Sequence, residues 1–190
     1  MSKVFNPSLI KCLTLPRKQL QDFERSSLSL KELPYTTWMA LTIIAIVGSC
    51  IYGASLSLVL PDWQPTGGAL WILLSAGLGW FVFGPSLIYI TKKSIFICAH
   101  ACMITMAYGE GVLTIAALVN LFLYFNLPVS LDLASLNFIM VVISNIVMAT
   151  VLTLQMQAIQ VAWWKSLLTW MLALNGSGAV FFYLLKQILK

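Results

Sequence analysis

Charged side chains are scarce in this chain of 190 residues. Only 9% of the residues are Asp, Glu, Lys or Arg, while 60% are hydrophobic. In an ordinary soluble domain about a quarter of the residues are charged, so this chain has too few charges to cover a surface in water. Most of them precede Pro34, and the rest of the chain is nearly uncharged. The composition excludes an ordinary soluble domain and predicts an integral membrane protein.

Groups for catalysis and metal binding are also few. His100 is the only histidine, so neither a haem held by two histidines nor a metal site with three histidine ligands can be built from this chain. Cys98 and Cys102 share a helical face at a spacing that suits two metal ligands, but we interpret them as packing residues. The chain has no phosphate-binding glycine loop and no nucleophile with a base at usable spacing. We therefore expect no enzyme activity, catalytic residue, metal or cofactor.

Residues 1–34 are predicted to form a basic cytoplasmic or interfacial segment. The first thirty residues are mixed polar and lack the short apolar run of a secretory signal, so the N-terminus is expected to stay on the cytoplasmic side of a bacterial inner membrane. The net charge of +5 lies mainly beside the membrane spans. There, anionic lipids attract each Lys or Arg by about 1 kcal/mol. We therefore expect membrane lipids, and no nucleic acid, as the partner of these charges.

Within this segment, apolar residues alternate with basic and polar ones. They are Phe5, Leu9, Ile10, Leu13, Leu20 and Phe23, and Pro16 interrupts them. The pattern suits a short amphipathic helix in the headgroup region of the bilayer. A partly disordered cytoplasmic tail is the alternative.

Long apolar runs fill residues 35–190. Because a bilayer core about 30 Å thick needs about 20 apolar residues in a helix, we predict five spans, at about 38–60, 68–91, 94–125, 136–157 and 167–187. The fold class is then all-α, a polytopic transmembrane helical bundle. With the N-terminus inside, Lys92, Lys93 and Lys165 fall on the cytoplasmic side, as the positive-inside rule requires. Lys186 and Lys190 fall outside.

The third span is longer than the membrane is thick. As one helix, residues 94–125 would extend about 48 Å at 1.5 Å per residue. We predict one long span that is tilted or kinked near Gly109, Glu110 and Gly111. A pair of half-helices broken at these residues is the alternative, although each half would be too short to cross.

Four polar residues inside the spans form the candidate site: Glu110, His100, Asn120 and Asn145. Glu110 is the only acidic residue within a span, and an ionisable group at this depth usually faces the bundle interior or water. It is either a functional group or a residue that stabilises the kink. His100 lies about 15 Å from it along the same helix, so the two cannot touch there. Asn120, Asn145 and Gln155 either bond neighbouring helices, which we favour, or line a pathway.

Small residues recur at four-residue spacing on two spans. They are Ala45, Ser49, Gly53 and Ser57 on the first and Ala101, Thr105 and Gly109 on the third. Such rows let helix backbones approach closely in lipid. They predict a compact bundle, or contact with a membrane-protein partner or a second copy of the chain.

The approach to the first span has a recognisable layout. From Ile10 to Leu58 a basic segment containing proline, Leu13–Lys18, is followed by a short polar helix and the first span. In this layout the chain resembles Yip1-domain membrane proteins, which have five spans, a cytoplasmic N-terminus and short loops. Phe83–Pro85 partly matches the family's Tyr-Gly-Pro signature, but it lies inside the second span and lacks the preceding Asp-Leu. The resemblance implies a non-enzymatic protein that acts through partners or membrane organisation.

Three functions follow as hypotheses. The first is a non-catalytic, Yip1-like scaffold, assembly factor or accessory subunit. The second is a small transporter or ion-conducting protein that uses Glu110. The third is an intramembrane hydrolase, because Asn175–Gly178 is similar to the G-x-S-G motif of rhomboid-type proteases around Ser177. Asn175 replaces the first Gly of that motif, and we favour packing as the role of this run.

Overall fold

The computed structural model describes residues 9–26, 33–58, 64–126 and 133–188, with the side chains of 133–134 and 176–188 left out. Within these ranges the chain is helical and contains no strand. The elements are α1 (Leu9–Thr14), α2 (Pro16–Ser26), α3 (Tyr35–Ser55), the 3-10 helix η2 (Leu56–Leu58), α4 (Pro65–Thr91), α5 (Ile95–Asn126), α6 (Leu133–Ala158) and α7 (Trp163–Ile188). The all-α prediction is confirmed for the described residues.

Four helices are long and apolar enough to cross a membrane. They cover Tyr35–Leu58, Pro65–Thr91, Ile95–Asn126 and Ser135–Ala158, and they correspond to the first four predicted spans. The span expected at 167–187 falls on α7, whose side chains from residue 176 onward lie outside the described part. The count of five spans therefore stays a prediction.

The third span is one uninterrupted helix. α5 contains 32 residues and continues through Gly109, Glu110 and Gly111, so the alternative of two half-helices is wrong. At 1.5 Å per residue it is about 48 Å long, more than the thickness of the hydrocarbon core. The kink expected near the glycines stays a prediction.

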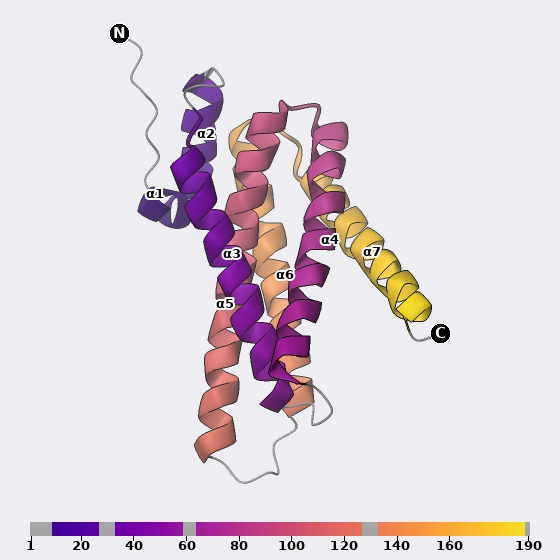
Figure 1. Ribbon diagram of the computed structural model, residues 1–190. Coiled ribbons are helices and arrows are strands. Elements are labelled where there is room, and N and C mark those ends of the chain that lie inside the picture. The colour runs from indigo at the N-terminus through magenta and orange to yellow at the C-terminus, as the bar shows by residue number, and fades with distance from the viewer. Residues whose placement is uncertain (1–8, 27–32, 59–63, 127–132, 189–190) are drawn as a thin grey trace.

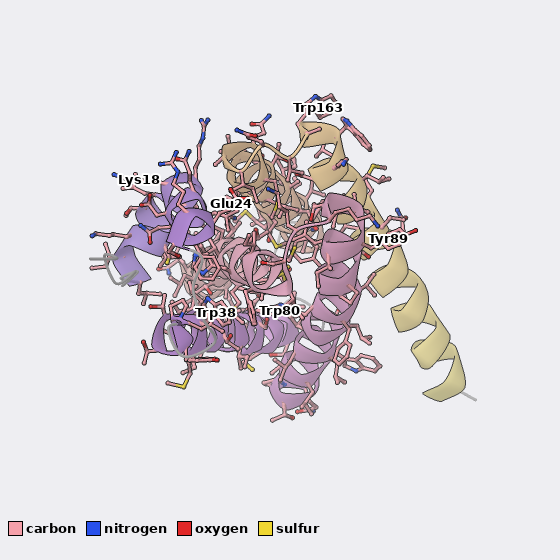
Figure 2. All side chains as sticks on the ribbon, turned by 90° about the horizontal axis from the view of Figure 1, so that it is seen from above. Lys18, Glu24, Trp38, Trp80, Tyr89 and Trp163 are labelled. Atoms are coloured by element: carbon pink, nitrogen blue, oxygen red, sulfur yellow. The ribbon has the colours of Figure 1, made fainter. Side chains whose placement is uncertain are left out.

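α5 lies at the centre of the bundle. Viewed from the end, α2, α3, α4 and α6 surround it (Figure 2), and α3 and α6 pack along it most extensively. α7 leaves the bundle obliquely on the outer side of α4 (Figure 1). α4 itself lies at the edge of the bundle, where only Gly68, Phe83, Leu87 and Thr91 are buried along it and most other residues are partly exposed. Because α5 is central, neighbouring helices cover its polar side chains, and these side chains are buried in protein.

Basic residues gather at one end of the bundle. The helix α2, the turn between α4 and α5 and the turn between α6 and α7 all lie there (Figure 1). Lys93 forms an ion pair with Glu24 of α2, with 2.6 Å between Nζ and Oε1, and Lys18 points outward from α2 (Figure 2). The structure confirms that the N-terminal helices and the two lysine-containing turns share one end. The assignment of that end to the cytoplasm stays a prediction.

The N-terminal helices pack against the bundle. Pro16, which interrupts the apolar pattern, begins α2, and residues 9–26 are helical rather than a disordered tail. α2 is a short helix that buries Gln19, Leu20 and Phe23, and its expected place in the headgroup region stays a prediction. Cys12 is fully buried in a cluster with Leu41 and Ile104, and the Tyr108 hydroxyl donates a hydrogen bond to the Leu13 carbonyl. Part of the apolar face of this segment is therefore covered by protein, while Ile10 and Leu15 stay exposed.

Candidate functional site

Glu110 lies halfway along the central helix α5 and is 4% exposed. The Ser49 hydroxyl of α3 is its hydrogen-bond partner. The Oε2 atom is buried and has no hydrogen-bond partner among the described residues. Burying a carboxyl oxygen without a partner is costly, so this group is the most unusual one in the described part of the bundle.

The backbones of α3 and α5 are in direct contact at Glu110. A Cβ atom added at Gly48 would lie 2.9 Å from the Glu110 carbonyl oxygen and 2.9 Å from the Thr114 Oγ1 atom. That threonine hydroxyl donates to the Glu110 carbonyl at 2.8 Å. Because Gly48 has no side chain, α3 and α5 can approach closely here, and Glu110 lies next to Ser49.

Glu110 lines a cavity of about 350 Å³ between α3 and α4. The other lining residues are Thr42, Ala45, Ile46 and Ser49 of α3 and Leu73, Ala76, Gly77, Trp80 and Phe81 of α4. Trp80 lies on the side of α4 that faces α3 (Figure 2). Ile46 and Phe81 are 45% and 82% exposed, so the cavity opens sideways toward the lipid. Glu110 is the only charged residue in its lining.

A second cavity, of about 210 Å³, lies among α3, α4, α5, α6 and α7. Glu110 lines it as well, together with Asn145 of α6, Tyr52 of α3 and Trp170 of α7. Ala76 of α4 lines both cavities. Two of the four predicted site residues, Glu110 and Asn145, therefore share one cavity.

The space opposite Glu110 lies between two points at which α4 is in close contact with neighbouring helices. Toward one end, α4 crosses α3 so closely that a Cβ at Gly53 would lie 2.4 Å from the Gly68 carbonyl oxygen. Toward the other end, Phe83 meets Trp170 edge to face with 5.3 Å between ring centroids. Between these contacts, a Cβ at Gly77 or Gly79 would meet nothing within 4 Å. Small residues of α4 thus leave the gap unfilled.

Asn120 lies away from these cavities and joins helices. Its side chain exchanges two hydrogen bonds with Asn137 of α6, at 2.8 and 2.9 Å, and donates to Ser55 of α3 at 3.3 Å. Gln155 of α6 donates to Thr105 of α5 at 3.1 Å. The interhelical role predicted for Asn120 and Gln155 is confirmed, but the role of Asn137 was missed because nothing in the sequence marks it as the partner.

For Asn145 the predicted interhelical bond is wrong. Its amide donates at 2.8 Å to the Val141 carbonyl one turn earlier on the same helix. A helical carbonyl four residues back is always within reach of such a side chain, so the amide is satisfied without a second helix. Asn145 and Glu110 are related only in that both line the second cavity.

His100 joins the N-terminal helices to the bundle. The Trp38 Nε1–H group donates to His100 Nδ1 at 2.8 Å, and the Phe23 ring of α2 stacks on the imidazole with 4.5 Å between centroids and 5° between planes. Neither His100 nor Asn120 lines either cavity. The structure therefore does not bring His100 or Asn120 together with Glu110 at these two cavities, because both are packed against other helices.

Replacing Phe23 with alanine is expected to release the N-terminal helices. The substitution removes the ring that stacks on His100 and packs beside Trp38, and loss of a buried Phe costs about 3–5 kcal/mol. Cys12, which is fully buried on α1, should then react faster with a maleimide in a Cys50→Ser background. Lys18→Ala, at an exposed position on α2, is the control. Equal labelling of both variants would show that Phe23 does not hold α1 and α2 in place.

The structure describes the side chains of the cysteine pair but not those of the serine motif. Cys98 and Cys102 are free and lie in an apolar cluster. No group of three or more His, Cys, Asp or Glu residues that could hold a metal occurs in the described ranges. The side chain of Ser177 lies outside them, so the hydrolase hypothesis is not tested.

The chain matches no family model, no curated protein and no solved structure. Its resemblance to Yip1-domain proteins stays a prediction. Fold class alone does not determine function, so the site itself carries what can be inferred.

Proposed function

We propose that this protein is a small transporter or ion-conducting protein in which Glu110 binds the ion. The observation that carries the proposal is the Oε2 atom of Glu110, buried without a partner among the described residues at the middle of the central helix. Ionisable groups at membrane depth are expensive to bury and commonly mark ion or substrate pathways. A group kept only for packing would be better served by an apolar residue.

The four spanning helices contain no Lys or Arg, so they supply no counter-ion for Glu110. The carboxyl group must then be neutralised by a proton or by a cation from outside these helices. Glu110 and Ala76 line both cavities. An ion bound at Glu110 would thus have open space beside it in two cavities.

The same proposal includes the membrane placement. We place the protein in a bacterial inner membrane with five spans, α7 being the fifth, and with the N-terminus in the cytoplasm. The support is the gathering of Lys93, Glu24 and the basic N-terminal helices at one end of the bundle, because cytoplasmic loops are rich in Lys and Arg.

Glu110→Gln is expected to abolish proton flux. Glutamine keeps the size and the polar contact of the side chain but cannot take up or release a proton. Purified protein is placed in liposomes with a pH-sensitive dye inside, and a pH gradient is applied with valinomycin and K⁺ present to balance charge. The flux of the variant should fall to the level of protein-free liposomes.

Glu24→Gln is the matched control, since it removes an acid of α2 outside both cavities and should leave the flux unchanged. Wild-type flux no greater than that of empty liposomes, or equal flux in Glu110→Gln and wild type, would rule out the proposal.

A scaffold or accessory subunit without enzyme activity is the second candidate. The observation that favours it is on α4, where Gly77 and Gly84 lie seven residues apart, and a Cβ at either would meet nothing within 4 Å. Residues at this spacing share a helical face, and small residues allow a partner helix to approach closely in lipid. Extraction in mild detergent followed by native mass spectrometry should then find a stoichiometric partner that Gly84→Leu removes. A lone protein would count against this function.

A further inference from the structure

We infer that the cavity between α3 and α4 binds a lipophilic monovalent cation, an ammonium group on an apolar body, with Glu110 as its counter-ion. The inference rests on the proposed role of Glu110 and names the class of ligand. Three properties of the cavity carry it: its charge, its walls and its opening.

The charge of the cavity is a single carboxyl group. The only other titratable side chain that lines either cavity is Tyr52 of α3, and the lining residues on α4, α6 and α7 are all non-ionisable. Glu110 Oε2 has no donor among the described residues. One carboxylate without a cationic neighbour matches one positive charge on the ligand.

The walls favour an organic cation over a metal ion. Besides Glu110, the cavity between α3 and α4 offers only two hydroxyl groups, and that of Thr42 already donates to the Trp38 carbonyl at 2.9 Å. Hard metal ions need about six oxygen ligands, which these residues do not provide. Trp80 and Phe81 instead present aromatic rings, which attract ammonium groups. The volume of about 350 Å³ is within the range of small-molecule sites, about 300–1,000 Å³.

The opening faces the bilayer. Its rim carries Ile46 and Phe81, which are exposed on the outer surface of the spans. Pro85 lies inside α4 and has no N–H group, so it cannot bond the Phe81 carbonyl one turn earlier. The Phe81 carbonyl thus lacks the helical hydrogen bond that residue 85 would otherwise donate. An amphiphilic cation dissolved in the membrane can enter from the side.

The test uses benzyltrimethylammonium, which carries a permanent positive charge on an apolar body. Binding of the radiolabelled probe to the full chain is measured by equilibrium dialysis in dodecyl maltoside, with protein-free micelles as background. We expect saturable binding of one cation per chain that weakens as the pH falls, because protons compete for the same carboxylate. Glu110→Gln should weaken binding by about tenfold or more, the equivalent of about 1.4 kcal/mol.

The neutral isostere neopentylbenzene, in which carbon replaces nitrogen, should not compete with the probe. Equal competition by this hydrocarbon would overturn the inference, because the cavity would then bind apolar molecules without recognising a positive charge. Absence of saturable binding by the wild-type chain would overturn it as well.

Substitutions at three glycines of α4 would show which cavity holds the ligand. A Cβ atom at Gly77, Gly79 or Gly84 meets nothing within 4 Å, so we expect these substitutions to leave the backbone of α4 in place. Gly77 lines the cavity between α3 and α4, Gly79 lines the second cavity, and Gly84 lines neither. Gly77→Phe should abolish probe binding, while Gly84→Phe should leave it unchanged. Loss of binding in Gly79→Phe alone would place the ligand in the second cavity and overturn this assignment.

Failure of the inference is separable from failure of the proposed function. Proton flux that depends on Glu110, without binding of the cation, would overturn the ligand class and leave the ion-binding role intact. Cation binding that depends on Glu110, without proton flux, would support the ligand assignment and overturn the proposed transport function.

Discussion

Replacing Gly53 with alanine is expected to destabilise the helical bundle by about 1–3 kcal/mol, as overpacking of a close contact does. The added Cβ would lie 2.4 Å from the Gly68 carbonyl oxygen and 2.8 Å from the Ala69 Cα atom. Both are backbone atoms, so α3 and α4 must move apart as whole helices. The loss is measured as the shift in the unfolding midpoint, followed by circular dichroism during titration with sodium dodecyl sulfate.

Two other glycines provide controls for this prediction. At Gly109 the three atoms nearest to a new Cβ all belong to the side chain of Met148, which can shift more easily than a backbone, so alanine there should cost less than at Gly53. At Gly67 it would meet nothing within 4 Å, and Gly67→Ala should leave the midpoint unchanged. Similar losses in Gly53→Ala and Gly109→Ala would show that α3 and α4 are not held together at Gly53.

Replacing Asn120 with leucine is expected to cost about 1–3 kcal/mol, since it removes a hydrogen-bonded partner from buried polar groups. The variant loses both bonds to Asn137 and the bond to Ser55. The same detergent titration measures the loss. The contact joins α5 to α3 and α6, so the effect should extend to the whole bundle.

The double variant Asn120→Leu with Asn137→Leu provides the sharper test. When both partners of a buried hydrogen bond become apolar, the desolvation cost disappears with them. The double variant should therefore be more stable than the sum of the two single losses predicts, with a coupling of about 0.5–3 kcal/mol. Strictly additive losses would mean that the two amides do not act as a pair.

Several features could be predicted from the sequence because they depend on one helix at a time. The apolar runs predicted the four spanning helices, and Pro16 predicted the break between α1 and α2. The rows of small residues correctly predicted close packing, with Gly53 against α4 and Gly109 against α6. Each of these signals lies along a single segment, where helical geometry relates residues that are three or four positions apart.

The candidate site was predicted only in part, because its members come from different helices. Glu110 was identified from the cost of an acid in a span, yet its hydrogen-bond partner Ser49 was seen only as a small packing residue. His100 was grouped with Glu110, whereas Phe23 and Trp38 hold it at the end of the bundle. No pattern within α5 indicates which residues of other helices lie against it.

The sequence by itself determined that this is a helical membrane protein with most of its basic residues at one end and one acidic residue inside a span. Composition, length of apolar runs and charge position are enough for that, since the bilayer acts on each segment separately. The tertiary structure alone decided that Glu110 lies between two cavities, because that depends on where α4 touches its neighbours. In lipid, the hydrophobic effect does not select helix partners, and the shapes of side chains and the pairing of polar groups select them instead. Contacts such as Gly53 with Gly68 and Phe83 with Trp170 position α4 and so leave the cavity beside Glu110. The sequence of one helix does not reveal these contacts.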